Sequence, residues 1–587
     1  MQHAKKGIPY HLSLLLILLL LVLAACDSNT APPQQGPGAP SKATQDKQVL
    51  VQPYTDISDL STLDPALVQD ANANQAVNML YNGLVQIGDR GTIINALASS
   101  YQVAPDGLTW TFTLRNKLMF SDGTPLTSTD VVYSLDRALR VGAKSAFASY
   151  ALGLIKNADQ LAAGKLKTLI GSSIQAPNAQ TVVIVTSKKA AYFLAMLTYP
   201  AAYVVEKSLV ARYGNHFTDH LAEGGGSGPW IVSSYIHNQE IDFTPNPNYF
   251  GAKPQLRLIA RPFYKVEETA YRAYASNTLS YAPVPEDQIP QAKALSNDQY
   301  HQEPTLVTAY YTMNYLVKPF DNIKVRQAFA LALNKNQIAA NAYNGSVIAT
   351  NHIVPQGIPA YNAKLTAPGG VTNTAGNPTL AKKLFDEGLQ EDGLTLSSLP
   401  AITLTVSTGG LPDAQQEVTL ETQMWQSALG ITVNVNDIDY TKLLSESQAT
   451  TGNKKGLMFW GLGWIGYYPD PQDWLSVQFG QGMANNNMNY GQNHALDAPQ
   501  QQTVQQLLGQ ADSNLNATSR LQQYTLAEQQ LVNDVAWLPI YQQTLTYVEK
   551  PCVVGMIDNA FTIMPPDDWS KVYISTDTPC ADTSKYK

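Results

Sequence analysis

The chain has 587 residues, of which 14% are charged, and its formal net charge is −8. A chain of this length exceeds what a single hydrophobic core holds, so we expect two or three domains. The mildly acidic balance, with no basic stripe and no zinc-finger spacing, argues against a nucleic acid as partner.

The N-terminus has the layout of a secretory signal. Two lysines precede an apolar run over residues 12–25, which is short for a transmembrane span, and small residues lead to Cys26. The tetrad Leu-Ala-Ala-Cys at 23–26 resembles the lipobox of bacterial lipoproteins. This resemblance implies that residues 1–25 are a signal peptide and that the Cys26 thiol carries a lipid. The alternative is an ordinary signal peptide with a chance cysteine.

The segment 26–48 is rich in Pro, Gly, Ser, Gln and Ala and has almost no large apolar side chain. Such a composition cannot offset the entropy of ordering, which predicts a flexible linker after the lipidated Cys26. No later run approaches transmembrane length. We therefore expect a globular body that is tethered to a membrane from outside the cytoplasm, at the cell surface or in a periplasm.

The first clear elements of the body lie between residues 108 and 139. In "LTWTFTLR", 108–115, apolar and polar side chains alternate, which predicts a strand. The stretch 125–139 predicts a helix with Thr127 as its N-cap, and Asp130 lies where a carboxylate favours the helix N-terminus.

Two features further along could suggest a metal or phosphate site. His216 and His220 stand four residues apart, and Asp219 or Glu223 would be offered as a third ligand. The adjoining "GGGSGPW", 224–230, is rich in glycine, but no Gly-Lys-Ser/Thr follows it. We expect no metal site, and we interpret the glycines as a tight chain crossover. No G-x-S-x-G, H-E-x-x-H or Walker lysine motif occurs, so no catalytic residue is predicted.

The region 401–437 predicts a strand, a helix and a second strand. Apolar residues alternate in "AITLTVST" from Ala401 and again in "ITVNVND" from Ile431. Between them, 411–429 has helical spacing and ends at Gly430. Strand, helix, strand with short joints is a βαβ unit, which indicates a parallel, helix-covered sheet and an α/β chain with mixed sheets.

The segment "GLGWIGYYPDPQDWL", 461–475, concentrates aromatic residues and glycines. Such a segment can be a folded core, a stacking platform or the wall of a binding cleft. Its rings could stack on aromatic side chains or sugar faces, or bind a cation. The candidates are Trp460, Trp464, Tyr467 and Tyr468, with the alternative that the two tryptophans are core residues. Asp470, between two prolines, is expected to form a turn.

Cys552 and Cys580 remain as a pair once Cys26 is assigned to lipidation. In an oxidising compartment we expect them to form a disulfide that pins the C-terminal tail. The alternatives are two free thiols or an incomplete metal site.

Five stretches, in order, resemble one family. The most specific is "DGLTWTFTLRNKLMFSDGTPLTSTDVVYS", which lies within 61–139 and is similar to the N-terminal region of the large solute-binding proteins of peptide-type ABC importers. The others are 226–254, 313–339, 461–475 and 527–541, and together the five cover nearly the whole body.

The resemblance implies an α/β fold with mixed sheets, a two-lobed periplasmic-binding-protein (Venus-flytrap) clamp. Two crossings, near Tyr310–Leu316 and Trp537–Gln542, would form a hinge about which the lobes close over a ligand. An extra accessory domain sits on the first lobe. The implied boundaries are 49–92, 224–310 and 537–587 with the C-terminal tail for the first lobe, 93–223 for the accessory domain and 311–536 for the second lobe.

The resemblance also places the aromatic segment on the second-lobe wall of the cleft, with Gly463 and Gly466 among the ligand-binding positions. Relatives usually have an Asp that pairs with the α-amino group of a peptide, and this chain has Tyr467 there. Many relatives have an acidic residue where this chain has Asn82. Both changes remove negative charge, and burying an ammonium without a carboxylate is costly.

The function implied is that of a lipid-anchored, substrate-binding component of an ABC importer. It would capture peptides, longer ones included, and pass them to permease and ATPase subunits, as a monomer and without a cofactor or metal. The alternatives are a non-peptide solute, such as a sugar or a cationic compound, or a role as a surface sensor. A hydrolase on the same clamp would need a nucleophile and base or a metal set that the sequence does not offer.

Overall fold

The computed structural model describes residues 40–142, 146–557 and 559–586. Residues 1–41 and 42–587 are separate units, and the second is the folded body. The predicted signal peptide, Cys26 and the linker as far as residue 39 lie outside the described residues. Within the described part of the chain, no helix has the length and apolarity needed to cross a membrane.

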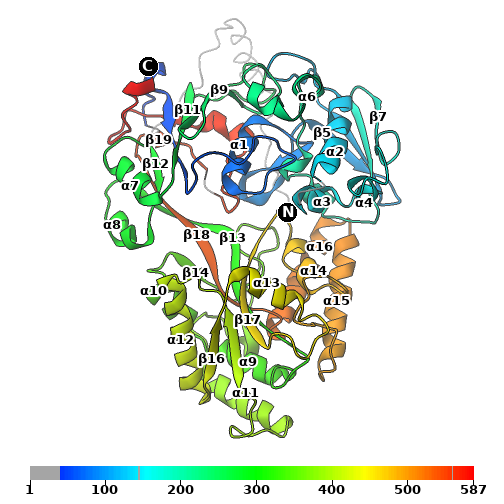
Figure 1. Ribbon diagram of the computed structural model, residues 1–587, viewed down its shortest axis with the longest axis vertical. Coiled ribbons are helices and arrows are strands. Elements are labelled where there is room, and N and C mark those ends of the chain that lie inside the picture. The colour runs from blue at the N-terminus through cyan, green and yellow to red at the C-terminus, as the bar shows by residue number, and fades with distance from the viewer. Residues whose placement is uncertain (1–39, 143–145, 558, 587) are drawn as a thin grey trace, which may run out of the picture. The chain divides into compact units, whose positions relative to one another are not determined.

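The first lobe contains a five-stranded sheet in the order β1-β11-β10-β9, with β2 beside β11 (Figure 1). β1 runs parallel to β11, whereas β10 is antiparallel to both of its neighbours. The strands are β1 (Val49–Val51), β2 (Tyr54–Thr55), β9 (Trp230–Ile236), β10 (Glu240–Pro245) and β11 (Leu258–Tyr264). The helices are α1 (Ala71–Leu80), α6 (Lys207–Tyr213), α7 (Glu267–Ala275) and α8 (Ile289–Lys293).

A separate four-stranded antiparallel sheet, β5-β6-β8-β7, is inserted between β2 and β9 in the sequence. We call it the accessory sheet. Its strands are β5 (Ala98–Val103), β6 (Thr109–Leu114), β7 (Ile174–Asn178) and β8 (Thr181–Val185), and a hairpin of β3 (Val85–Ile87) and β4 (Ile93–Asn95) precedes them. Its helices are α2 (Ser128–Val141), α3 (Ala146–Leu152), α4 (Ala158–Ala162) and α5 (Phe193–Met196).

The second lobe is built on a seven-stranded mixed sheet in the order β12-β18-β13-β17-β15-β16, with β14 beside β18. Its strands are β12 (Tyr281–Pro283), β13 (Tyr300–Met313), β14 (Val347–Ala349), β15 (Ile402–Val406), β16 (Val433–Asp437), β17 (Phe459–Ile465) and β18 (Leu538–Glu549). Its helices are α9 (Ile323–Leu331), α10 (Lys335–Asn341), α11 (Pro378–Glu391), α12 (Pro412–Leu429), α13 (Tyr440–Gln448), α14 (Ser476–Phe479), α15 (Ala498–Ser513) and α16 (Ala517–Asn533).

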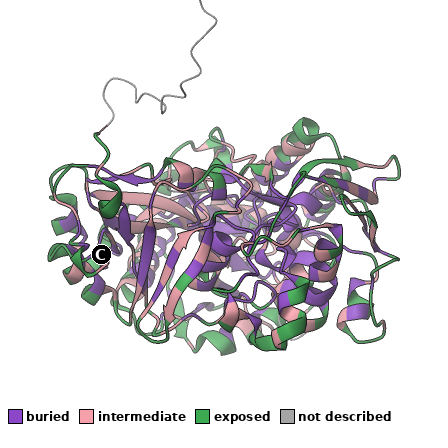
Figure 2. Ribbon diagram, turned by 90° about the horizontal axis from the view of Figure 1, so that it is seen from above, coloured by how far each residue is buried: buried purple, intermediate pink, exposed green. Residues whose placement is uncertain are grey.

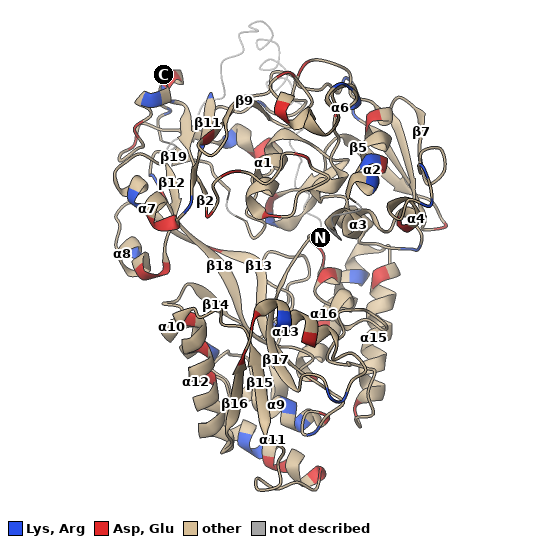
Figure 3. Cartoon of the chain, viewed as in Figure 1, with Lys and Arg blue, Asp and Glu red and all other residues tan. Residues whose placement is uncertain are grey.

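Two long antiparallel strands, β13 and β18, connect the lobes (Figure 1). At one end, β18 pairs with β12 next to the first lobe, and at the other, β13 pairs with β17 inside the second lobe. The expected crossings at 310–316 and 537–542 lie at the second-lobe ends of these strands. Buried residues follow the sheets and the inner faces of the helices (Figure 2), and the sparse charges are scattered over the helices and loops (Figure 3).

Several local predictions are confirmed. β15 and β16 are parallel, and α12 joins them and ends at Gly430, which has a left-handed backbone, so the βαβ unit is present. The alternating stretch 108–115 forms β6. The helix after it is α2, and its first turn is closed because the backbone N–H of Thr127 donates to Asp130 at 2.9 Å.

The glycine-rich crossover adopts backbone angles that other residues avoid, with φ of 156° at Gly224 and 95° at Gly225. A β-carbon at Gly228 would lie 2.3 Å from the carbonyl oxygen of Met79, so the chain passes too close to α1 for a side chain. The preceding segment, Gly214–His220, is a 3-10 helix, and His216 and His220 each face an acidic neighbour three residues on. Among the described residues, no group of three or more His, Cys, Asp or Glu is placed to hold a metal ion.

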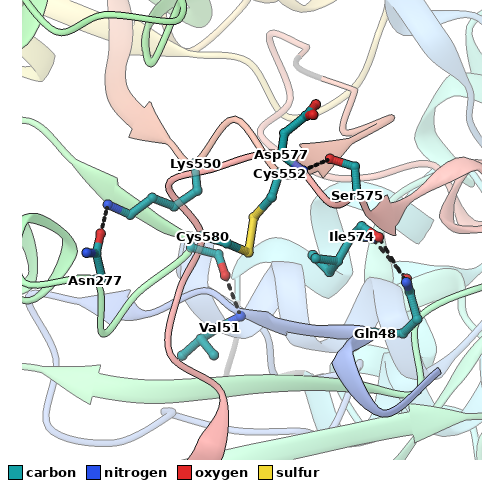
Figure 4. Close-up of a disulfide and its surroundings, with 10 residues drawn as sticks. Gln48, Val51, Asn277, Lys550, Cys552, Ile574, Ser575, Asp577 and Cys580 are labelled. Atoms are coloured by element: carbon teal, nitrogen blue, oxygen red, sulfur yellow. Dashed lines mark hydrogen bonds between the residues drawn. A yellow bond between two sulfur atoms is a disulfide. The ribbon is translucent and has the colours of Figure 1, made fainter. Parts of the chain in front are cut away.

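The C-terminal tail packs on the start of the body (Figure 4). Cys552 and Cys580, the pair that the sequence analysis expects, form a disulfide with an S–S distance of 2.10 Å. The amide group of Gln48 forms two hydrogen bonds of 2.9 Å with the backbone of Ile574, and Lys42 bridges to Ser575. Residues 42–48, which the sequence analysis places in the flexible linker, therefore belong to the folded body.

Candidate functional site

A cavity of about 490 Å³ lies between the two lobes, and we call it the interlobe cavity. The first lobe contributes the loop before α1 and the loop near Phe561, and the accessory region contributes Phe147 and Tyr199. The second lobe contributes Leu306 and Val307 from β13 and residues 465–467 from the aromatic segment. Segments that are hundreds of residues apart in the sequence thus line one cleft.

The walls of the interlobe cavity are mostly apolar, aromatic and amide side chains. Asp70 is the one residue with an ionisable carboxylate among the lining residues that the structure describes. Its side chain caps α1, because Oδ1 accepts the backbone N–H of Ala73 at 2.9 Å, and it also accepts the hydroxyl of Ser61. Asp70 is exposed, so this cavity offers one solvated carboxylate and no cation from the described chain.

Tyr467 lines the cavity, as the sequence analysis expects of a ligand-binding residue. Its ring contacts those of Phe147, Tyr150 and Trp464, at centroid distances of 5.4, 4.9 and 5.7 Å. Phe147 and Tyr150 belong to α3, a helix of the accessory region, and Trp464 belongs to β17. All three ring pairs are edge-on, and such a cluster holds the Tyr467 ring at a fixed orientation toward a ligand.

Asp473 holds the backbone at Tyr467, although sequence reasoning did not single it out. Its Oδ2 accepts the N–H of Tyr467 at 2.6 Å, and its Oδ1 accepts the hydroxyl of Tyr150 at 2.5 Å. Burial raises the pKa of Asp473 to about 7 in spite of these hydrogen bonds. The carboxyl group therefore joins the second lobe to α3 and is not presented to the cavity.

Several candidates from the aromatic segment lie in the core. Trp460 and Tyr468 are 1% and 2% exposed, and the Tyr468 hydroxyl donates to Gln472. Neither lines the interlobe cavity, so the alternative that Trp460 is a core residue is the one the structure shows. Trp464 is half-buried and contacts Tyr467. Gly466 lines the cavity, and it must be glycine because a β-carbon would lie 1.8 Å from the ring of Trp474.

Asp470 does more than the turn that its sequence suggests. Its side chain accepts the N–H of Gln472 at 3.0 Å, as a turn residue does. It is also 2% exposed and forms a two-pronged ion pair with Arg520 on α16, with one N···O distance of 2.9 Å. Its charge is therefore neutralised within the second lobe.

Asn82 lies away from the interlobe cavity. It is fully buried, and its amide donates to the carbonyl of Ser227 and accepts from the side chain of Gln86, both at 2.5 Å. These bonds join the end of α1 to the glycine-rich crossover. Asn82 is therefore not a ligand-binding residue of this cavity, and an acidic residue at position 82 would not lie in its wall.

Strand β17 presents an open edge along the cleft. The N–H of Gly466 donates to Leu306 at 2.9 Å, and β17 pairs antiparallel with β13 in the same register. Because antiparallel pairs alternate, the backbone groups of Gly463 and Ile465 point away from β13. On that side β15 pairs with β17 only at Phe459 and Trp460. Gly463 is exposed and Ile465 is 60% exposed, so an extended ligand can reach their backbone groups.

Comparison with known proteins agrees with this architecture. Residues 92–486 match the family model described as bacterial extracellular solute-binding proteins, family 5 Middle. The chain is 24% identical over 527 residues to the oligopeptide-binding protein OppA of Bacillus subtilis, with 88% of this chain and 90% of that protein covered. It is 27% identical over 517 residues to the periplasmic oligopeptide-binding protein OppA of Salmonella typhimurium, covering 87% and 90%.

Among solved structures, the unliganded open form of the periplasmic murein tripeptide binding protein MppA has a similar fold, with a TM-score of 0.77 at 23% identity. The alignment covers 92% of this chain and 99% of that one. The fold is thus the two-lobed clamp of periplasmic binding proteins. The chain belongs to family 5 of the bacterial extracellular solute-binding proteins.

The candidates that sequence reasoning missed are Asp70, Phe147, Tyr199 and Phe561. Asp70 carries a readable signal, since it precedes the helical stretch 71–80 as an N-cap. That signal predicts a helix start, and it does not say that the start faces the second lobe. The three aromatic residues lie in unremarkable sequence, and only the tertiary fold brings them to the cavity.

Proposed function

We propose that the protein captures peptides in the interlobe cavity and delivers them to an ABC importer in the membrane. The observation that carries this proposal is the open edge of β17 at Gly463 and Ile465. A peptide that lies along this edge forms main-chain hydrogen bonds as an added strand, and these bonds are independent of its sequence. The relatives named as oligopeptide-binding proteins support the same ligand class.

Position 467 carries a tyrosine and no carboxylate, which favours longer peptides that are bound through their backbone. A dipeptide relies on its charged ends, whereas a longer peptide gains hydrogen bonds with each residue that pairs with the edge. Tyr467 and Trp464 then contact peptide side chains, and Asp70 is the one carboxylate that the described lining of the interlobe cavity offers to an amine.

Closure of the lobes about β13 and β18 completes the site in this proposal. The first-lobe residues near Asp70 and Phe561 and the second-lobe residues 465–467 line opposite parts of the same cavity. Binding energy that favours the closed arrangement shifts the two lobes together, as in other hinged binding proteins. The boundaries 93–223 for the accessory domain and 311–536 for the second lobe are part of this proposal. The second-lobe sheet is completed by strands from outside that range, namely β12, most of β13 and β18.

The experiment that tests peptide capture uses the body from Lys42 onward, purified from an oxidising compartment. Native mass spectrometry would show what co-purifies, and calorimetry would follow with a five-residue peptide and its singly N-methylated forms. We expect peptides of mixed sequence to co-purify. Methylation at alternate positions should weaken binding by about tenfold or more, because each methyl removes one backbone donor. If no peptide of any length binds, the proposal is wrong.

We further propose that Cys26 is lipidated and holds the body outside the cytoplasmic membrane. The lipobox-like tetrad before it supports this, and family 5 proteins are extracellular solute-binding proteins. Mass spectrometry of the full chain extracted with detergent should find acyl groups on Cys26 at the new N-terminus. A Cys26→Ser variant should appear in the soluble extracellular or periplasmic fraction. A membrane-bound Cys26→Ser variant would contradict the anchor.

A further inference from the structure

A second cavity, of about 210 Å³, lies in the second lobe beside the interlobe cavity. We call it the lobe-two cavity. Val307 and Gln543 line both cavities, so the two adjoin each other. The open edge of β17 passes along both as well, because Gly463 lines the lobe-two cavity and Ile465 lines the interlobe cavity. A peptide added to this edge therefore passes from one cavity to the other.

The chemistry of the lobe-two cavity differs from that of the interlobe cavity. Glu417 on α12 is the one carboxylate among its described lining residues, and no Lys, Arg or His lines it. Five tyrosine side chains line the same cavity, and they come from β13, the end of α10, α13 and β18. They are Tyr310, Tyr311, Tyr343, Tyr440 and Tyr541. Carboxylate oxygens and aromatic faces both attract a cation.

Glu417 is only partly satisfied within the protein. It is 8% exposed, and its Oε2 accepts the hydroxyl of Tyr343, which is 3.0 Å from that of Tyr541. Within the described residues, nothing donates to its other oxygen, Oε1. This oxygen is not among the fully buried atoms that lack a partner, and Glu417 lines the lobe-two cavity, so Oε1 is accessible to a ligand group there.

Glu421, one turn further along α12, is a second buried carboxyl group without a bonded cation. It is fully buried behind Tyr311, which donates to its Oε2, and its Oε1 has no partner in the part of the chain that the structure describes. The buried Lys335 is near enough to affect Glu421, but its ammonium donates to the carbonyl of Thr350 and to Asn351, at 3.0 and 2.6 Å. Neither glutamate therefore has a cation bonded to it.

Burial has the expected effect on both acids. It raises the pKa of Glu417 to about 7 and that of Glu421 well above its usual range. Asp413, in the first turn of α12, also raises the pKa of Glu417. At neutral pH, Glu421 is therefore protonated and Glu417 is partly protonated. A cation that enters the cavity would favour the ionised form of Glu417.

We propose that the lobe-two cavity is a subsite for the cationic side chain of a bound peptide, a lysine ammonium or an arginine guanidinium, with Glu417 as its counter-ion. This inference rests on the proposed function, because the peptide backbone on β17 positions the side chain. Tyr343 orients the carboxylate, and the other tyrosines enclose the aliphatic part of the side chain. The unpaired oxygen of Glu417 accepts the donor that the protein lacks.

The test is calorimetry with five-residue peptides in which lysine is placed at each position in turn. Norleucine at the same position is the matched neutral control, because it has the same length without the charge. We expect the protein to prefer lysine to norleucine by about tenfold or more at one position of the bound peptide. In Glu417→Gln that preference should disappear, while the affinity for the norleucine peptide stays unchanged.

Glu446→Gln is the control variant, because Glu446 is a surface residue on α13 that pairs with Lys442 and its loss changes the net charge equally. It should keep the preference for lysine. If Glu417→Gln does not fold, Glu417→Met serves in its place, since an apolar side chain of similar length avoids an unpaired polar group. If peptides bind but lysine and norleucine give equal affinities at every position, the subsite is wrong and the proposed function stands. If no peptide binds at all, the proposed function falls and the subsite with it.

Discussion

The second lobe holds two sets of buried carboxyl groups, one paired with an arginine and one without a bonded cation. Asp470 is paired with Arg520 through two nitrogen atoms and also caps the turn at Gln472. Glu417 and Glu421 receive only one tyrosine hydroxyl each and no bonded cation. All three are at most 8% exposed, so burial alone does not separate them.

The difference separates a structural group from a ligand-binding one. A buried ion pair with all its hydrogen bonds made is a closed unit and has nothing left to offer a ligand. A buried carboxyl group without a cation is still free to ionise when a cation enters the cavity that it lines. Asp470 therefore fixes the loop that carries Tyr467, whereas Glu417 marks a place where a positive charge is missing.

Breaking the paired set should have the largest effect on stability. Arg520→Met would leave Asp470 buried without its counter-ion, and we expect the free energy of unfolding to fall by about 3–5 kcal/mol. Urea unfolding followed by circular dichroism would measure it. Arg90→Met is the matched control, because the Arg90 side chain is 89% exposed and its loss should change little. A similar small change in both variants would show that the Asp470–Arg520 pair does not hold the loop.

Glu528 on α16 is a third buried carboxyl group without a charged partner. The Nδ1 of His352 lies 3.8 Å from its Oε1, but burial lowers the pKa of His352 to about 4, so that ring is neutral at higher pH. Glu528 extends the comparison to the pH dependence of stability. Burial raises its pKa to about 8, although its Oε1 accepts the N–H groups of Ile353 and Val354. The folded protein thus keeps a proton that the unfolded chain loses near its ordinary pKa. Stability from this residue is complete at pH 4 and is lost as the pH rises towards 8.

Glu528→Gln removes this titration and can still accept both N–H groups. We expect the variant to match the native protein at pH 5 and to exceed it by roughly 2–4 kcal/mol at pH 8. Parallel urea titrations at the two pH values would measure the difference. Glu446→Gln serves again as the exposed control. Equal stability of Glu528→Gln and the native protein at pH 8 would mean that Glu528 ionises normally.

Adding a carboxylate to the interlobe cavity tests the other half of the comparison. Tyr467→Asp should raise the affinity for peptides with a free α-amino group by roughly tenfold, because an ion pair replaces a ring contact. Tyr467→Asn is the neutral control of the same size, and N-acetylated peptides should show no gain with either variant. Calorimetry that finds no gain for free-amine peptides would place the peptide N-terminus elsewhere.

The smallest change in the free energy of unfolding is expected from Glu417→Gln in the absence of a ligand. Glu417→Gln keeps an acceptor for Tyr343, so its free energy of unfolding should stay within about 1 kcal/mol of the native value. The same urea titrations would show this. A loss as large as that of Arg520→Met would make Glu417 a structural residue and remove the contrast between the two sets.

Regular elements with a clear period could be predicted from the sequence, and βαβ at 401–437 is the best example. The site could be predicted only where one segment carries it, as at Tyr467. Asp70 and Phe561 enter the cavity from distant parts of the chain, and no local pattern reports that meeting. Glu417 and Glu421 were readable in part, because they share a helical stripe with the buried Trp425, yet acidic residues on a helix are usually assigned to solvent.

The packing of residues 42–48 on the C-terminal tail has a mechanical consequence. A pull on the chain ahead of Lys42 would act on the bridge to Ser575 and on the two hydrogen bonds between Gln48 and Ile574. The disulfide between Cys552 and Cys580 closes a loop that contains Ile574 and Ser575, so the load would pass through a covalent link to Cys552, directly after β18.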